Sequence, residues 1–151
     1  MLIQLLVGSA VSAINIILHA AVTMIAIPIA RTAALRSPSR PLLYLAGVMM
    51  ATSLVLMAAH TLEVFVWSIA YAVVKAAPDD TSLVYFAFVN YTTLGYGDVI
   101  PLPKWRLLGP MTAMNGVLMF GWSIALIFEV LTKAVGQYEK SRPDSKDRRG
   151  Q

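Results

Sequence analysis

The sequence predicts an all-α membrane protein in which three helices cross the membrane and a fourth, shorter helix enters it without crossing. Hydrophobic residues make up 58% of the 151 residues and charged residues only 13%, and the mean hydropathy is +0.68. A soluble globular domain has fewer apolar and more charged residues. Three apolar runs each exceed the roughly 20 residues that a helix needs to cross a bilayer. The length allows one domain.

The first span is predicted over residues 1–30, which contain no formal charge. A cleaved signal peptide is the alternative, but no basic segment precedes the apolar run, and the arginines follow it. The segment "RTAALRSPSRP", residues 31–41, carries three arginines and two prolines. It predicts a polar loop in which the chain turns.

The second and third spans enclose the remaining features. An outer helix is expected over residues 42–76, where Glu63 is the only acidic residue, and an inner helix over residues 106–132. The third span is followed by a polar tail, residues 133–151, that contains six lysines and arginines. We expect this tail to be mobile or to lie on anionic headgroups.

The basic residues set the orientation. The positive-inside rule places the 31–41 loop and the tail in the cytoplasm, which puts the N-terminus and residues 75–106 outside, as in a multi-pass protein of a plasma or inner membrane. The net charge of +4 therefore reads as a topology signal, and no nucleic-acid partner is predicted. Trp67, Tyr71 and Trp105 are expected near the outer interface and Tyr44 near the inner one.

A short apolar run between the second and third spans predicts a re-entrant helix. Asp79, Asp80 and Thr81 offer N-cap oxygens, so we expect a helix over residues 81–92, roughly 18 Å long. Such a helix goes only partway into the membrane, and the chain must return. Non-helical backbone at membrane depth is tolerated only when it is buried in protein or lines a watery cavity.

The returning segment, residues 93–98, has an unusual glycine pattern. Gly95 and Gly97 alternate with larger residues, and glycine reaches φ > 0 without steric cost. Alternating the hand of successive residues can turn their carbonyls toward one side, and four copies around an axis would form cages of oxygens for a monovalent cation. The C-terminal, partially negative end of the preceding helix would also favour a cation.

These residues, "TTLGYGD" at positions 92–98, resemble the selectivity-filter signature of potassium channels. A glycine-rich surface turn is the alternative. The resemblance covers the pore domain, residues 42–132, and implies a homotetramer. It also implies that K⁺ binds the carbonyls and that Tyr96 points away from the axis into the pore-helix packing, with Asp98 at the outer mouth. The implied filter comprises Thr93, Leu94, Gly95, Tyr96, Gly97 and Asp98, with the Thr93 hydroxyl at its inner end.

The sequence also departs from the potassium-channel pattern. Leu94 replaces the commoner valine, and this replacement is often found in the family. Tyr85, Phe86 and Phe88 occupy the region where many relatives have tryptophans that brace the filter. Val89 stands where some relatives have a glutamate paired with the mouth aspartate. That glutamate brace is expected to be absent. The predicted filter supports are Thr92, Tyr85, Phe86, His60 and Glu63.

Two features of the third span suggest a gate. Gly116 is a hinge in the interpretation that the resemblance favours, or a site of close helix packing, and Asn115 beside it is expected to face the cavity or the pore helix. Phe120, Ile124 and Phe128 share one stripe, which forms either a hydrophobic inner gate or a lipid-facing surface.

Ionisable residues within the spans are functional candidates. His60 and Glu63 are neighbours on one helix face and allow three interpretations: hydrogen bonds to Asn90 or Tyr91 behind the pore helix, a proton-sensitive gate, or a transition-metal site with His19. His19 lies only ~18 Å from the inner end of its span and His60 ~28 Å, so their pairing requires tilt or offset. Glu129 forms an ion pair with Lys133 or contributes to a carboxylate ring at the inner mouth.

The function that follows is a potassium-selective channel that conducts K⁺ passively. The arginines of the 31–41 loop are not arranged along a span, so no intrinsic voltage sensor is predicted, and the first helix is an addition that packs outside the pore. A poorly selective cation channel and a non-conducting sensor or accessory subunit are the alternatives. No enzyme is predicted, since the chain has no cysteine and only two histidines. We expect membrane lipids as partners, no cofactor besides K⁺ as the permeant ion, and no small-molecule substrate beyond cations.

Overall fold

The structure is a computed structural model, and it describes residues 1–34 and 41–141. Within these residues the chain forms four α-helices and one short 3-10 helix, and no strand. Three of the helices are long and apolar enough to cross a membrane, over Leu2–Ile29, Leu42–Val74 and Pro103–Gly136. The predicted all-α membrane fold is therefore confirmed. The elements are α1 (Leu2–Ala34), α2 (Pro41–Val74), α3 (Leu83–Tyr91), η1 (Pro103–Trp105) and α4 (Leu108–Ser141).

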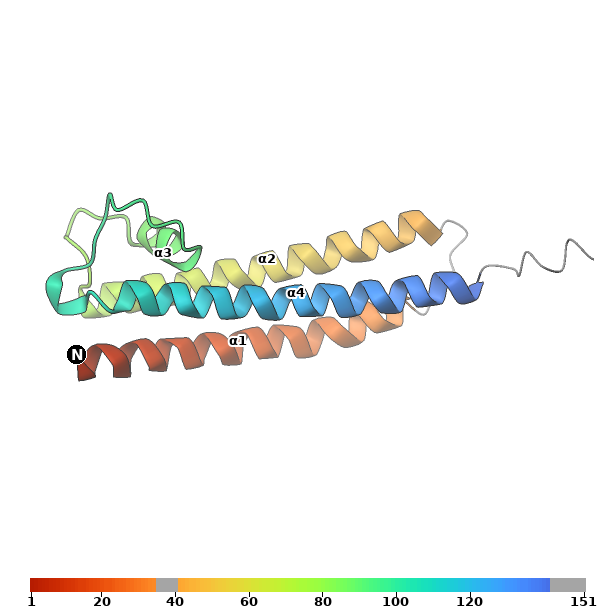
Figure 1. The fold of residues 1–151 in the computed structure, drawn as a ribbon, viewed down its shortest axis with the longest axis horizontal. Helices are drawn as coiled ribbons and strands as arrows, with labels where there is room; N and C mark the ends of the chain where they lie inside the picture. The colour runs from red at the N-terminus through yellow and green to blue at the C-terminus, as the bar shows by residue number, and fades with distance from the viewer. Residues whose placement is uncertain (35–40, 142–151) are drawn as a thin grey trace, which may run out of the picture.

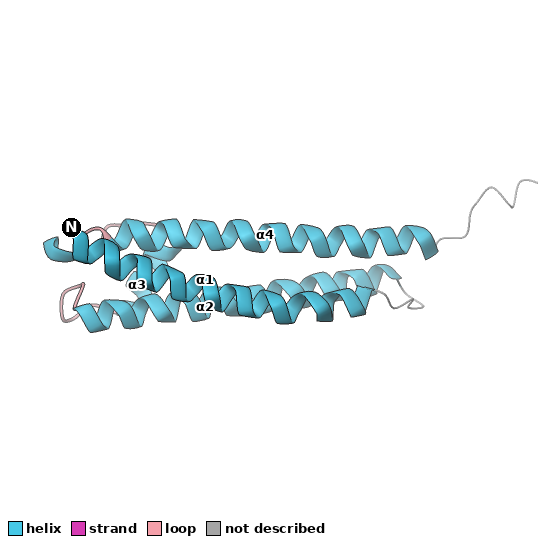
Figure 2. Ribbon diagram, turned by 90° about the horizontal axis from the view of Figure 1, so that it is seen from below, coloured by secondary structure: helices cyan, strands magenta, loops and turns pink. Residues whose placement is uncertain are grey.

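The three long helices run side by side, and the short α3 lies at one end of the bundle (Figures 1 and 2). In Figure 1, α3 lies on one side of α2 and α4, and α1 lies on the other. The N-terminus is at the same end as the α2–α4 connection, while the end of α4 is at the opposite end. Three crossings in alternating directions therefore place residue 1 and residues 75–107 on one side of the membrane.

The end of α2 is set by a backbone motif. Lys75 adopts the left-handed conformation, with φ 51°, just after the last helical residue, Val74. The Lys75 amide donates to the carbonyl of Ala72 at 3.2 Å, and the Ala76 amide donates to that of Tyr71 at 3.0 Å. These two bonds form a Schellman motif, which satisfies carbonyls that a helix end would otherwise leave unpaired.

The start of α3 differs from the prediction. The N-cap is Ser82, which makes no side-chain capping bond, so Asp79, Asp80 and Thr81 do not cap the helix. The reason is a turn, closed by a 3.1 Å hydrogen bond from the Thr81 amide to the Pro78 carbonyl, whose central residues are the two aspartates. The helix can therefore begin only after this turn.

The helices also extend beyond the predicted boundaries. α1 continues to Ala34, and α2 begins at Pro41, the first-turn position that proline favours. α4 continues to Ser141, so the inner helix extends nine residues beyond its predicted end at residue 132, into the segment predicted as a tail. That stretch contains no proline and several good helix formers, and proline first returns at Pro143. The rest of the loop and of the tail, including Arg36 and Arg40, lies outside the described residues.

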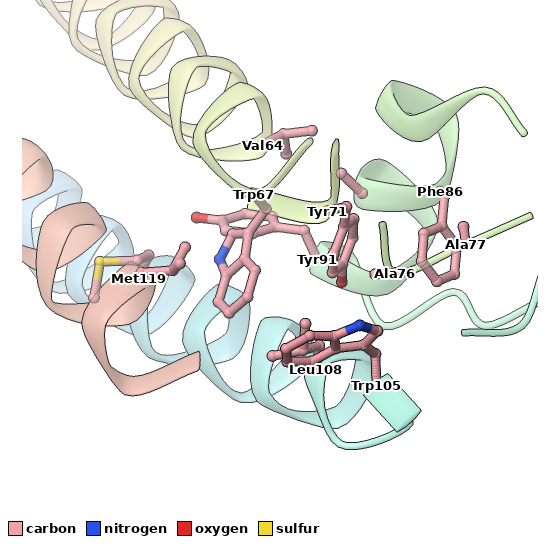
Figure 3. Packing of buried hydrophobic residues seen from close by; sticks show 12 residues of the cluster. Val64, Trp67, Tyr71, Ala76, Ala77, Phe86, Tyr91, Trp105, Leu108 and Met119 are labelled. Carbon is pink, nitrogen blue, oxygen red and sulfur yellow. The ribbon is translucent and has the colours of Figure 1, made fainter. Parts of the chain in front are cut away.

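The core gathers at the end of the bundle that holds α3. Large aromatic rings of α2 fill the space between α3 and α4 (Figure 3), with ring centroids 4.8 Å apart for Tyr71 and Phe86. Trp67 and Tyr71 are fully buried, and Trp105 is 6% exposed. These three rings, predicted near the outer membrane interface, therefore pack inside the protein at the end of the bundle that holds α3, and their height relative to the interface stays a prediction.

Candidate functional site

The segment after α3 alternates in backbone hand. φ is 61° at Thr93, 57° at Gly95 and 78° at Gly97, whereas Leu94 and Tyr96 between them keep negative φ. The expectation that the two glycines adopt positive φ is confirmed, and a threonine joins them. Positive φ is unusual for a β-branched residue and costs about 1–3 kcal/mol. Such strain is maintained only where the surrounding structure imposes it.

Hydrogen bonds to the end of α3 impose that conformation. The Thr93 amide donates to the carbonyl of Asn90 at 3.0 Å, and the Leu94 amide donates to that of Val89 at 3.0 Å. The C-cap is Thr92, so these bonds form a second Schellman motif, with a threonine in the position that glycine usually takes. The returning segment is thereby held at its first residues by the helix that precedes it.

The rest of the segment is open in the single chain. Residues 92–98 are all exposed, with Leu94 54% and Tyr96 68% exposed. The expectation that Tyr96 packs against the pore helix is therefore not met within one chain. An exposed return segment between membrane-crossing helices requires cover from protein or contact with water.

A hydrogen bond braces the outer part of the segment. The Tyr85 hydroxyl donates to Asp98 Oδ2 at 2.6 Å, which joins α3 to the predicted mouth. Val89 stands where some relatives have the glutamate, so the bond to Asp98 comes instead from Tyr85, a partner that the sequence did not predict. The Asp98 carboxylate, through this bond and its charge, raises the pKa of Tyr85.

The other predicted filter supports in this region, Phe86 and Thr92, hold α3 in place. Phe86 is buried against Tyr71, so it anchors α3 to α2. The Thr92 hydroxyl donates to the carbonyl of Phe88 in its own helix at 2.7 Å. The Asn90 side-chain amide donates to the carbonyl of Phe86 at 3.0 Å, and Asn90 also hydrogen-bonds the Tyr71 side chain of α2.

Behind α3, a buried polar cluster joins all four α-helices. Glu63 of α2 accepts a short hydrogen bond from the Tyr91 hydroxyl of α3. Its Oε1 lies 2.7 Å from His19 Nδ1 of α1, and its Oε2 lies 3.1 Å from His60 Nδ1 of α2. The Ser123 hydroxyl of α4 contacts the other nitrogen of each histidine. The structure thus confirms hydrogen bonding of His60 and Glu63 behind the pore helix, through Tyr91.

His19 lies nearer to His60 than the estimate of their heights suggests, with ring centroids 5.3 Å apart. Because α1 runs on to Ala34, His19 is ~22 Å from its inner end at 1.5 Å per residue. The remaining difference of ~6 Å is taken up by the offset between α1 and α2. His19 and His60 therefore pair, and the offset between α1 and α2 that their predicted heights required is present.

A second polar contact set lies closer to the α3 end of the bundle. Asn115 Oδ1 accepts bonds from Asn15 Nδ2 and from Trp67 Nε1, each at 2.9 Å. Asn115 thus faces α1 and α2, and the expectation that it faces the cavity or the pore helix is wrong. Near the N-terminus, Gln4 Oε1 accepts the Leu107 amide at 2.9 Å.

α1 has a polar face that was not predicted from the sequence. Its buried polar residues Gln4, Asn15, His19 and Thr23 recur at spacings of 11, 4 and 4 residues, which place them on one helix face. Polar side chains in a span usually face other helices. This periodicity was the available signal that α1 packs through a polar seam.

Gly116 lies where α4 meets the end of α3. A Cβ added at this glycine would overlap the backbone carbonyl oxygen of Tyr91. α4 continues through this position without a break. Of the two interpretations of Gly116, the contact supports close packing.

The stripe of three residues on α4 divides into two parts. The Phe120 ring lies 4.7 Å from that of His60 and 5.5 Å from that of Tyr91, between centroids, so Phe120 is part of the interior of this chain. Ile124 and Phe128 are each 68% exposed. For these two residues a hydrophobic inner gate and a lipid-facing surface both stay predictions. Further along α4, the expected ion pair between Glu129 and Lys133 is present, while a carboxylate ring stays a prediction.

This arrangement defines a class of protein. Two membrane-crossing helices, α2 and α4, are joined by a short helix and a returning segment that alternates in hand, which is the architecture of a pore-loop channel. Residues 59–133 match the family model described as an ion channel. This match spans the second half of α2, the pore loop and most of α4, and through it the chain belongs to the ion channel family. No curated protein and no solved structure matches the chain.

Proposed function

We propose that the chain is the subunit of a potassium-selective channel through which K⁺ moves passively down its gradient. The carrying observation is the alternation of positive φ at Thr93, Gly95 and Gly97 directly after α3. A uniform strand points successive carbonyls to opposite sides, whereas alternation in hand allows them to face one side. Such a ladder of oxygens can replace the hydration shell of K⁺.

In this proposal the carbonyls of Thr93, Leu94, Gly95 and Tyr96 bind the ion, together with the Thr93 hydroxyl. One chain supplies only one side of each oxygen cage, so the pore requires four copies around an axis. The exposure of Tyr96 supports this assembly, because a neighbouring copy can cover the ring that its own chain leaves open.

The electrostatics of the site favour a cation. The C-terminal end of α3, with its partial negative charge, leads into the filter. Asp98, held by Tyr85, adds a carboxylate at the mouth. We place this mouth outside and the end of α4 in the cytoplasm of a plasma or inner membrane, on the basis of the basic residues. The proposed channel has no intrinsic voltage sensor.

Ion flux through purified protein in liposomes tests the proposal. We expect K⁺ flux, and a reversal potential that follows the K⁺ gradient when Na⁺ is the opposing ion. Gly95→Ala should abolish selective flux, since alanine is strained at the φ of 57° found there. Gly47→Ala is the matched control, because no atom lies within 4 Å of its added Cβ. Equal permeability to K⁺ and Na⁺ would identify a poorly selective channel, and a folded tetramer without flux would identify a non-conducting subunit.

A further inference from the structure

We propose that His19, His60 and Glu63 form a binding site for a divalent transition-metal ion such as Zn²⁺, between α1 and α2. Their donor atoms all lie within 4.8 Å of one another. The side chains of His19 and Glu63 are fully buried, and that of His60 is 14% exposed. Metal binding here does not depend on the proposed ion conduction, since the donors are side chains outside the filter.

The two imidazole rings are oriented as metal ligands are. Ser123 Oγ lies 2.9 Å from His60 Nε2 and 3.3 Å from His19 Nε2. A hydroxyl oxygen has two lone pairs, so it can accept an N–H from both rings at once. Hydrogen bonding at the second nitrogen is the usual way in which a protein fixes a metal-binding histidine. When Ser123 accepts both N–H groups, each Nδ1 carries a lone pair, and the Nδ1 of His60 also lies 3.1 Å from the Tyr91 hydroxyl oxygen.

Those free nitrogens face a buried carboxylate. His19 Nδ1 lies 2.7 Å from one oxygen of Glu63 and His60 Nδ1 lies 3.1 Å from the other. At these distances either a proton on each Nδ1 or a metal ion must lie between the nitrogen and the carboxylate oxygen, since two facing lone pairs would repel. Among the described residues, the ion-pair partners of Glu63 are these two imidazoles. A metal ion would supply the positive charge that the buried carboxylate requires.

The donor set and its size fit Zn²⁺ and similar ions. Imidazole and carboxylate ligands suit Zn²⁺, Co²⁺, Ni²⁺ and Cu²⁺, whereas Mg²⁺ and Ca²⁺ prefer oxygen alone. Tetrahedral Zn²⁺ places its nitrogen and oxygen ligands about 3.3 Å apart. The separations of 2.7 and 3.1 Å, each to a different oxygen of Glu63, would open by about 0.6 and 0.2 Å. Any wider separation in the set, up to its limit of 4.8 Å, would close toward the same value as the side chains rotate onto the ion. The Tyr91 hydroxyl, which contacts both Glu63 and His60, is a further oxygen beside the site.

The site has a route of entry and a connection to the pore. A cavity of about 490 Å³ is lined in part by His60, Tyr91 and Ser123, so an ion can approach from the side of His60. Tyr91 binds Glu63 through its hydroxyl and precedes Thr93 by two residues. A bound ion would therefore fasten α1 to the element that positions the returning segment.

Metal binding to the purified full-length protein in detergent tests this site. After treatment with a chelator, the protein should bind one Co²⁺ per chain, with visible absorption bands of a tetrahedral ion, and Zn²⁺ should displace it. His19→Gln and Glu63→Gln should each abolish saturable binding. Ser123→Ala retains all three ligands and should weaken binding by about 10- to 100-fold. Asp79→Asn, which removes an exposed carboxylate in the turn before α3, should leave binding unchanged.

Two results would overturn the metal site. One is the absence of saturable Co²⁺ and Zn²⁺ binding by wild-type protein that remains folded and assembled, which would mean that protons alone occupy the space between the histidines and Glu63. The other is unchanged binding in a folded His19→Gln variant, which would place the metal elsewhere. Because binding is measured without ion flux, failure of the channel proposal would leave both results interpretable.

Discussion

The contact between Gly116 and Tyr91 allows a test of how α4 supports the pore loop. In Gly116→Ala, the new Cβ would overlap a backbone oxygen, which cannot move aside as a flexible side chain can. We take the upper part of the range for overpacking, about 3 kcal/mol. Alanine recovers about 1 kcal/mol of helix propensity, so the net loss in the free energy of unfolding is about 2 kcal/mol. Gly121→Ala, on the same helix with no atom near its added Cβ, should instead gain up to about 1 kcal/mol.

Thermal unfolding of the purified protein in detergent measures both changes. At about 2–4 °C per kcal/mol for a chain of this size, Gly116→Ala should lower Tm by about 4–8 °C, while Gly121→Ala should not lower it. Flux measurements on the same samples separate packing from hinging. If Gly116→Ala keeps the wild-type Tm but changes the open probability, the packing interpretation is refuted and the hinge interpretation is supported.

Three further variants test the pore loop. Thr93→Gly should raise the free energy of unfolding by about 1 kcal/mol, because glycine relieves the strained φ. The same change should lower K⁺ selectivity, since the hydroxyl is lost. Thermal unfolding measures the first effect and reversal potentials measure the second. Tyr91→Phe leaves Glu63 without one buried donor and should cost about 1–3 kcal/mol, again by unfolding; a change below 0.5 kcal/mol, on the order of a surface substitution, would contradict this role. The Tyr85–Asp98 bond should be present below the ordinary tyrosine pKa of about 10 and be lost as pH rises through the raised pKa of Tyr85. Na⁺ leak should therefore increase at alkaline pH in the wild type, whereas Tyr85→Phe should leak at every pH, and identical pH profiles would refute the brace.

The sequence was sufficient for features that depend on local pattern. The long apolar runs predicted the three spans, since a bilayer demands that length of helix. The glycines at positions 95 and 97 predicted positive φ because few other residues adopt it at low cost. Helix ends were harder to predict, because the Schellman motifs at Lys75 and Thr93 place these residues in conformations that their side chains disfavour. No propensity rule selects a threonine for such a position.

Contacts between helices could not be derived from the sequence in the same way. The offset between α1 and α2 decides whether His19 meets Glu63, and it depends on packing along the whole length of both helices. The orientation of Asn115 depends on Asn15 and Trp67, which lie 100 and 48 residues away in sequence. A polar residue in a span predicts a partner but does not identify it.

The position of α1 shows that it does more than cover the outside of the pore domain. It contributes His19 to the cluster around Glu63 and Asn15 to the contacts of Asn115, and both sets lie behind the helix that carries the returning segment. If α1 were absent, Glu63 would lose its closest imidazole and the face of α2 and α4 that holds these polar groups would meet lipid, where each unsatisfied group costs several kcal/mol. The pore loop lacks the tryptophans that brace many related filters, and its position depends on Tyr85 in front and Tyr91 behind. Because Tyr91 is fixed through Glu63, the helix that lies outside the ion-channel match becomes part of the support of the pore.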